Sequence, residues 1–126
     1  MRILGLDYGE RRVGVAFADT GAARVALPLL TLSNDAALLL KLRTLIRDRG
    51  IVRVVVGLPL TLRGEEGAMA EAARQFGKRL HDNIALPVDF VDERLTTKVA
   101  RDAHNRDAGA AAAILETWLA RSTQSG

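Results

Sequence analysis

The segment that decides the fold reads Ile3-Leu4-Gly5-Leu6-Asp7-Tyr8-Gly9-Glu10-Arg11-Arg12-Val13-Gly14-Val15-Ala16-Phe17-Ala18, and it places Asp7 between two apolar runs. Residues 3–6 form the first run, and residues 13–17 alternate larger and smaller side chains at the two-residue period of a strand. Gly9 permits the tight turn of an antiparallel hairpin between the runs. We therefore expect Asp7 at the carboxyl end of the first strand, the end of an α/β sheet where ligands and catalytic groups gather.

The rest of the chain adds one more strand and then alternates helices and strands. Alternating Val25, Leu27 and Leu29 predict a third strand that ends near Pro28. Helical spacing predicts a helix from the cap Ser33-Asn34-Asp35 to Gly50, and others over 69–80, 96–104 and 107–120. Residues 51–57 and 87–91 predict two further strands. The order βββαβαβαα is that of an α/β fold of the ribonuclease H type, a mixed sheet with helices on both faces, in a single domain over residues 1–126.

Composition narrows the class of protein. Only 4% of the 126 residues are aromatic, so leucine, valine and alanine must form the core. The absence of cysteine excludes disulfides and thiolate metal sites. No apolar run approaches the roughly 20 residues of a membrane span, and no signal-peptide pattern starts the chain, so we expect a cytoplasmic protein without membrane contact. The net charge of +3 is compatible with a polyanionic partner but does not require one.

Three carboxylates are candidates for catalysis and for metal binding: Asp7, Glu93 and Asp107. In the expected sheet, Asp7 and Glu93 come from neighbouring strand ends. The small residues 108–113 let the last helix approach the sheet closely, which brings Asp107 toward the other two. Three carboxylates from separate segments suit two Mg²⁺ or Mn²⁺ ions about 4 Å apart, which stabilise the attacking and leaving oxygens of phosphodiester hydrolysis. Asp7, in the middle, would bridge the two ions.

Each candidate also has a purely structural interpretation. Asp7 could be the first residue of a tight turn, Glu93 an exposed charge, and Asp107 the N-cap of the last helix. His81 and His104 lack the spacing of metal ligands, and we expect them on the surface.

Basic and hydroxyl side chains flank the carboxylates in sequence. Arg11 and Arg12 follow the first strand and Arg94 adjoins Glu93, so we expect these arginines where phosphates of a substrate strand would lie. Thr96 and Thr97, at a helix N-terminus, would add donors to the same phosphates. The alternative is that one or more of these arginines only neutralises the acidic cluster.

Four motifs, in this order, resemble the YqgF/RuvX family, and the resemblance spans the whole chain. They are Leu4-Gly5-Leu6-Asp7-Tyr8-Gly9 with Arg12-Val13-Gly14-Val15-Ala16, Val56-Gly57-Leu58-Pro59-Leu60 with Gly64-Glu65-Glu66-Gly67, Val91-Asp92-Glu93-Arg94-Leu95-Thr96-Thr97, and Asp107-Ala108 before an alanine-rich helix. The resemblance implies a ribonuclease H-like fold and a cytoplasmic nuclease linked to maturation of the 5′ end of pre-16S rRNA. Relatives have also been proposed as Holliday junction resolvases. The acidic positions of the family fall on Asp7, Glu93 and Asp107.

We expect the substrate to be single-stranded or flexible RNA, in a ribosomal precursor particle, in preference to a four-way DNA junction. Symmetric resolution of a junction needs a dimer, whereas the apolar helix faces are all needed to cover the sheet, so we expect a monomer. Two functions of other classes stay open. Actin-like ATPases and sugar kinases share the sheet topology, but they close a second domain over the nucleotide. A non-catalytic RNA-binding or ribosome-associated factor would be indifferent to divalent metal.

Overall fold

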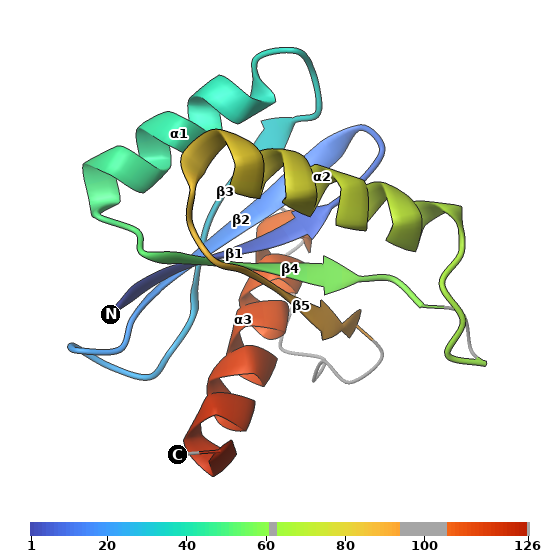
Figure 1. The fold of residues 1–126 in the computed structure, drawn as a ribbon. Coiled ribbons are helices and arrows are strands. Elements are labelled where there is room, and N and C mark those ends of the chain that lie inside the picture. Colours follow the sequence, from blue (N-terminus) through green and yellow to red (C-terminus); the bar gives the residue numbers. More distant parts are fainter. Residues whose placement is uncertain (61–62, 94–105, 126) are drawn as a thin grey trace.

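The computed structural model describes residues 1–60, 63–93 and 106–125, in which a five-stranded sheet lies between helices (Figure 1). In chain order the elements are β1 (Arg2–Tyr8), β2 (Arg12–Asp19), β3 (Leu27–Ser33), α1 (Leu38–Arg49), β4 (Arg53–Leu58), α2 (Ala68–Ile84), β5 (Val88–Asp92) and α3 (Arg106–Ser125). The strands lie in the order β3-β2-β1-β4-β5, with β1 antiparallel to β2 and parallel to β4. The expected mixed α/β sheet is confirmed, and the short helix expected over 96–104 lies outside the described residues.

The two faces of the sheet follow from the alternation of side chains along each strand. On β1, Leu4 and Leu6 point into a core formed with α1 and α2, whereas Ile3 points into a second core formed with α3. All three side chains are fully buried. Figure 1 shows the same layers, with α1 and α2 on one side of the sheet and α3 on the other. Because residues 3, 5 and 7 share a face, the side chain of Asp7 lies on the α3 side.

Small residues allow α3 to pack directly on β1 and β2. Ala108, Ala111 and Leu115 of α3 are fully buried. A Cβ added at Gly5 of β1 would stand 2.9 Å from the Cβ of Leu115 and 3.0 Å from the carbonyl oxygen of Ala111. Contacts that short leave no space for a side chain, so the missing Cβ at Gly5 lets the helix backbone lie on the strand.

A polar cluster anchors the second half of α3 at the other end of the sheet. Asp89 of β5 accepts a hydrogen bond of 2.7 Å from Arg53 of β4 and one of 2.9 Å from the indole Nε1 of Trp118. The Arg53 guanidinium also lies 5.8 Å from the centroid of the indole. One carboxylate thus ties two strands to α3 and fixes the rotation of the helix about its own axis.

The expected end of the third strand near Pro28 is wrong, because β3 begins at Leu27 and continues to Ser33. β2 offers pairing partners from Phe17, opposite Leu27, to Arg12, opposite Ser33, so β3 continues beyond the local alternation. Pro28 is tolerated because β3 is the outer strand on its side of the sheet.

The polar residues expected to cap α1 have other roles, since the helix begins only after Ala37. The Asp35 carboxylate accepts a hydrogen bond of 2.9 Å from the backbone N–H of Ala37. Asn34 reaches the turn between β1 and β2, where its side chain donates to the carbonyl of Gly9 and its backbone N–H donates to the carbonyl of Arg11, both at 2.8 Å. Asn34 therefore braces the turn that follows Asp7.

Replacing Gly109 with alanine is expected to stabilise the protein. A Cβ at this position of α3 would meet nothing within 4 Å, and glycine within a helix costs about 0.5–1 kcal/mol relative to alanine. Gly109→Ala should raise the free energy of unfolding by about that amount, measured by urea denaturation followed by circular dichroism. Gly5→Ala is the matched control and should lower the same quantity. A lower stability for Gly109→Ala would contradict the described packing of α3.

Candidate active site

Asp7 lies at the carboxyl end of β1, half-buried on the α3 side of the sheet. Its lateral neighbours are both glycines. On the β2 side, Asp7 pairs with Gly14. On the β4 side, the last pair is Leu6 with Val56, so the next residues of the two strands, Asp7 and Gly57, lie beside each other. Asp7 therefore lies between two strand positions that have no side chain, and the space above each is open to another segment.

The first turn of α3 occupies the space above Gly14. A Cβ added at Gly14 would overlap the carbonyl group of Asp107 and stand 2.9 Å from the amide nitrogen of Ala108. Because Gly14 is paired with Asp7, the start of α3 lies beside Asp7. The structure thus brings the backbone of Asp107 to the strand next to Asp7.

The Glu93 side chain occupies the space above Gly57. A Cβ added at Gly57 would stand 2.6 Å from Oε1 and 2.9 Å from Cγ of Glu93, and it would overlap the side chain of Ile114. The expectation that Asp7 and Glu93 end neighbouring strands needs correction, because β4 separates β1 from β5. The side chain of Glu93 extends over the glycine of β4, which is the next strand position beside Asp7.

Arg12 pairs with the third carboxylate. Its Nε lies 3.1 Å from Oδ2 of Asp107, and the Arg12 side chain is 69% exposed. The turn that presents Arg12 is closed by a hydrogen bond of 2.9 Å from the N–H of Gly9 to the Arg12 carbonyl and braced by Asn34. This geometry agrees with the alternative that an arginine neutralises the acidic cluster, while Arg11, in the same turn, is exposed.

The three carboxylates do not form a closed metal cage. Among residues 1–60, 63–93 and 106–125, no three Asp, Glu or His side chains lie close enough together to hold an ion. The donor chemistry nevertheless fits Mg²⁺ or Mn²⁺, since Asp7, Glu93 and Asp107 offer only hard carboxylate oxygens on one face of the sheet. Of the remaining candidate site residues, Arg94, Thr96 and Thr97 lie outside the described part of the chain.

The polar loop after β4 is tied to α2 by an ion pair. Glu66 accepts two hydrogen bonds from Arg74, the longer at 2.7 Å, and residues 60 and 66 form an isolated β-bridge. The hydrogen bonds from Arg74 lower the pKa of the Glu66 carboxyl and raise the pKa of Arg74. Because the folded-state pKa of Glu66 is lowered, the contribution of this pair to stability is present above the pKa of the unfolded chain and is lost as the pH falls through the folded value.

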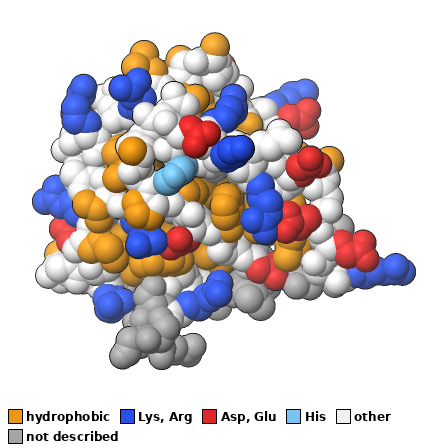
Figure 2. Space-filling model, viewed as in Figure 1, with side chains coloured by type: hydrophobic (Ala, Val, Ile, Leu, Met, Phe, Trp, Pro, Cys, Tyr) orange, Lys and Arg blue, Asp and Glu red, His pale blue; other side chains and the backbone are white. Residues whose placement is uncertain are grey.

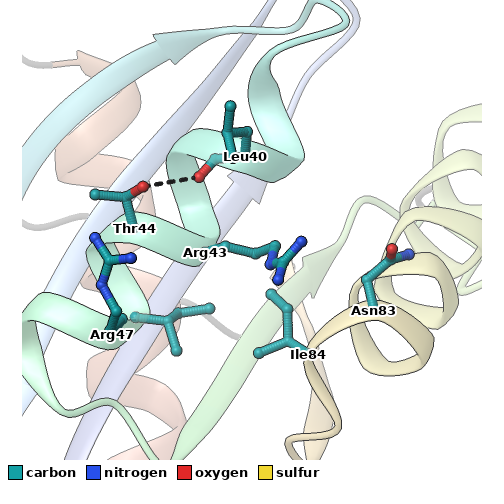
Figure 3. A pocket seen from close by; sticks show the side chains of 7 residues that line it. Leu40, Arg43, Thr44, Arg47, Asn83 and Ile84 are labelled. Atoms are coloured by element: carbon teal, nitrogen blue, oxygen red, sulfur yellow. Dashed lines mark hydrogen bonds between the residues drawn. The ribbon is translucent and has the colours of Figure 1, made fainter.

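A separate cavity of ≈ 330 Å³ lies between α1 and the end of α2 (Figure 3). Arg43 of α1 extends toward Ile84 and Asn83 of α2, and the hydroxyl of Thr44 donates to the carbonyl of Leu40. The end of α2 leads into the amino end of β5, whereas Asp7 lies at the carboxyl end of the parallel β1. This cavity is therefore distinct from the carboxylate site.

On the face of the molecule drawn in Figure 2, both basic and acidic side chains lie on the surface. His81 is exposed, as expected of a surface residue, and its Nδ1 lies 2.7 Å from the carbonyl oxygen of Leu86. His104 lies outside the described residues. No helix in the described residues has the length and apolarity needed to cross a membrane.

Sequence reasoning missed the two glycines and the asparagine that shape the site. Gly14 and Gly57 stand where the alternation of their strands calls for an inward side chain, and that interruption was the available signal. Asn34 gave a misleading signal, because an asparagine before a helix is typical of an N-cap.

Comparison with known proteins gives a consistent result. The family model described as "RuvX: Holliday junction resolvase" matches residues 1–121. A protein of Chloroflexus aurantiacus is 46% identical over 100 residues, which span 78% of this chain and 65% of that protein. A protein of Moorella thermoacetica is 40% identical over 139 aligned positions, which span all of this chain and 99% of the relative. Both carry the name "Putative pre-16S rRNA nuclease".

Among solved structures, the fold is similar to that of RuvC from T. thermophilus in complex with a Holliday junction substrate. The TM-score is 0.65 at 14% sequence identity, over all of this chain and 98% of the RuvC chain. Likeness at this identity concerns the fold alone, and it confirms the ribonuclease H-like fold expected from the sequence.

Gly57→Ala is expected to displace Glu93 while the sheet stays folded. The new Cβ would occupy the space of the Glu93 side chain, which must then leave the neighbourhood of Asp7. Gly67→Ala is the matched control, because a Cβ there meets nothing within 4 Å. Thermal shift on addition of Mn²⁺ measures the effect, and we expect a smaller shift for Gly57→Ala than for Gly67→Ala. Equal shifts would contradict a role for the Glu93 position in metal binding.

Proposed function

This chain belongs to the RuvX family, and from that premise we propose that it is a cytoplasmic metal-dependent nuclease that cleaves RNA in maturing the 5′ end of pre-16S rRNA. The observation that carries the proposal is the position of Asp7 between two glycines, with Glu93 above one and the start of α3, with Asp107, above the other. If Asp7 were only a turn residue and Asp107 only an N-cap, the neighbouring strand positions would not need to lack side chains. The catalytic unit would be one domain over residues 1–126.

We assign the three carboxylates to metal binding and catalysis. Asp7, Glu93 and Asp107 would hold Mg²⁺ or Mn²⁺ on the α3 face, with Asp7 between the other two. When bound, two such ions stabilise the attacking and leaving oxygens of an in-line displacement. Hydrolysis adds water across one P–O bond of the RNA, leaving a phosphate on one fragment and a hydroxyl on the other.

The arginines would bind the phosphates on either side of the cleaved bond. Arg12 lies at the edge of the site, and its exposed pair with Asp107 is worth only about 0.2–1 kcal/mol by comparison with other exposed pairs. Arg12 can therefore exchange Asp107 for a phosphate at small cost. Arg11 in the same turn, with Arg94, Thr96 and Thr97 just after Glu93 in sequence, completes the proposed phosphate-binding set.

A Holliday junction resolvase is the second candidate, because the matching family model is described by that activity. A resolvase needs two sites held by a dimer, whereas a monomer with one site suits a flexible RNA strand in a ribosomal precursor particle. The deciding experiment compares cleavage of single-stranded RNA and of a synthetic junction with Mg²⁺ or Mn²⁺, together with the solution mass. A stable dimer that nicks the junction symmetrically and leaves RNA intact would replace our assignment.

Asp7→Asn is expected to abolish cleavage and leave the fold intact. The amide keeps the shape of the side chain but removes the negative charge with which Asp7 would hold a divalent cation. Product formation from labelled RNA measures the loss, and circular dichroism with urea denaturation tests the fold. Cleavage at the wild-type rate would show that Asp7 is only a turn residue, and the nuclease assignment would fail at its centre.

Arg12→Gln is expected to tighten the binding of Mn²⁺. The variant removes the cation that competes with Mn²⁺ for Asp107. The apparent Kd for Mn²⁺ should therefore fall about two- to fivefold, which corresponds to the free energy of an exposed ion pair. Arg11→Gln is the matched control, since it removes the same charge from a residue that forms no ion pair within the described part of the chain. Calorimetric titration without RNA measures both. A change of the same size in Arg11→Gln would assign the effect to net charge.

A further inference from the structure

A groove on the opposite face of the sheet begins one residue after Asp7. It has a volume of ≈ 570 Å³ and is lined by Tyr8 of β1 and by a face of α2 with Gln75, Phe76, Lys78, Arg79 and Asp82. Because side chains alternate along a strand, Tyr8 points to the α2 side while Asp7 points to the α3 side. The groove and the carboxylate site thus lie on opposite faces of the sheet, at consecutive residues of the same end of β1.

The aromatic ring in this groove is held in a fixed orientation. Tyr8 stacks on Phe76, with ring centroids 4.5 Å apart and an angle of 24° between the planes. Phe76 is only 1% exposed, whereas Tyr8 is half-buried and lines the groove. A ring fixed from below by a core side chain loses little conformational freedom when a second planar group binds to it.

The rim of the groove favours an anion. Lys78 and Arg79 are exposed, and Asp82 is the only acidic side chain among the described residues of the lining, so positive charge prevails there. The Arg79 guanidinium lies 5.7 Å from the ring centroid of Phe76, beside the stacked rings. The amide of Gln75 adds both a donor and an acceptor.

We propose that this groove binds a nucleotide of the single-stranded RNA adjoining the scissile phosphate, with its base stacked on Tyr8 and its phosphate at Lys78 and Arg79. The inference rests on the proposed nuclease function and extends its substrate site to the second face of the sheet. A stacking ring beside basic side chains is the arrangement by which proteins bind single strands without reading their sequence. The position of the ring, next in the chain to Asp7, favours RNA over a protein partner.

The test uses the fact that Tyr8 is the only tyrosine of the chain. Protein labelled with 3-fluorotyrosine gives one ¹⁹F resonance, which reports on this ring alone. We titrate it with a single-stranded oligoribonucleotide of about eight nucleotides, a length within the site sizes of single-strand binders, in the absence of divalent metal. A stacked base should shift the resonance, with the same Kd as fluorescence anisotropy gives for the complex.

Two pairs of variants separate stacking and charge from folding. Tyr8→Leu should weaken RNA binding about tenfold, within the range of base–aromatic stacking, and Tyr8→Phe should restore it. Lys78→Gln should flatten the salt dependence of log Kd by about 0.7, the value for one phosphate contact with a single strand. Lys41→Gln, an exposed lysine on α1 outside the groove, is its matched control and should leave the slope unchanged.

The outcomes for the groove and for the nuclease are distinct. In one outcome, the protein cleaves the RNA when Mn²⁺ is added although the same RNA leaves the ¹⁹F resonance unmoved. That result would overturn the proposed binding of RNA in the groove and leave the proposed nuclease activity in place. A shifted resonance without cleavage under any divalent metal would support the groove and overturn the nuclease. Equal salt slopes for Lys78→Gln and Lys41→Gln, or a loss in Tyr8→Leu that Tyr8→Phe does not restore, would also overturn the groove.

Discussion

The direct contact between the backbone of α3 and the strands β1 and β2 is the constraint on which the site depends. Gly5 and Gly14 remove the two side chains that would keep the helix away from the sheet. A helix packed through larger residues would lie farther from the strands, and Asp107 would then lose its position beside Asp7. The same small residues that complete the core also set the geometry of the candidate site, so stability and function restrict these positions together.

Arg12 contributes a positive charge at the edge of the site. Carboxylates on the same face of a sheet repel each other, and a nearby cation lowers that cost. Arg12 supplies the positive charge at Asp107, but its side chain is 69% exposed, so water screens the pair and holds it weakly. A weakly held, exposed arginine is compatible with the proposed binding of divalent cations and phosphates at this site. Hydrogen bonds from Asn34 and Gly9 hold the backbone of the turn and do not involve the Arg12 guanidinium.

Local patterns in the sequence predicted most of the fold, because alternation and helical spacing record burial directly. The position of Asp7 at the end of β1 followed in the same way. The end of β3 did not, since it depends on the length of β2, which pairing across the sheet decides. The crossing of Glu93 over Gly57 was also beyond local reasoning, because residues 36 positions apart become neighbours only when β4 lies between β1 and β5. The contact of Tyr8 with Phe76 could not be predicted either, since it joins segments that no local pattern relates.

The alternation of side chains along one strand also places two different kinds of side chain on the two faces of the sheet. Asp7 and Tyr8 are consecutive, so one faces α3 and the other α2. Acidic groups on the α3 face and an aromatic ring with basic residues on the α2 face are thereby kept apart by the thickness of the sheet, yet both lie at the carboxyl end of the central strand β1. A flexible strand that passes around this end would place a phosphate on one side and a base on the other. A rigid duplex does not bend around a strand end in this way without deformation, which supports the proposal that the substrate is single-stranded RNA.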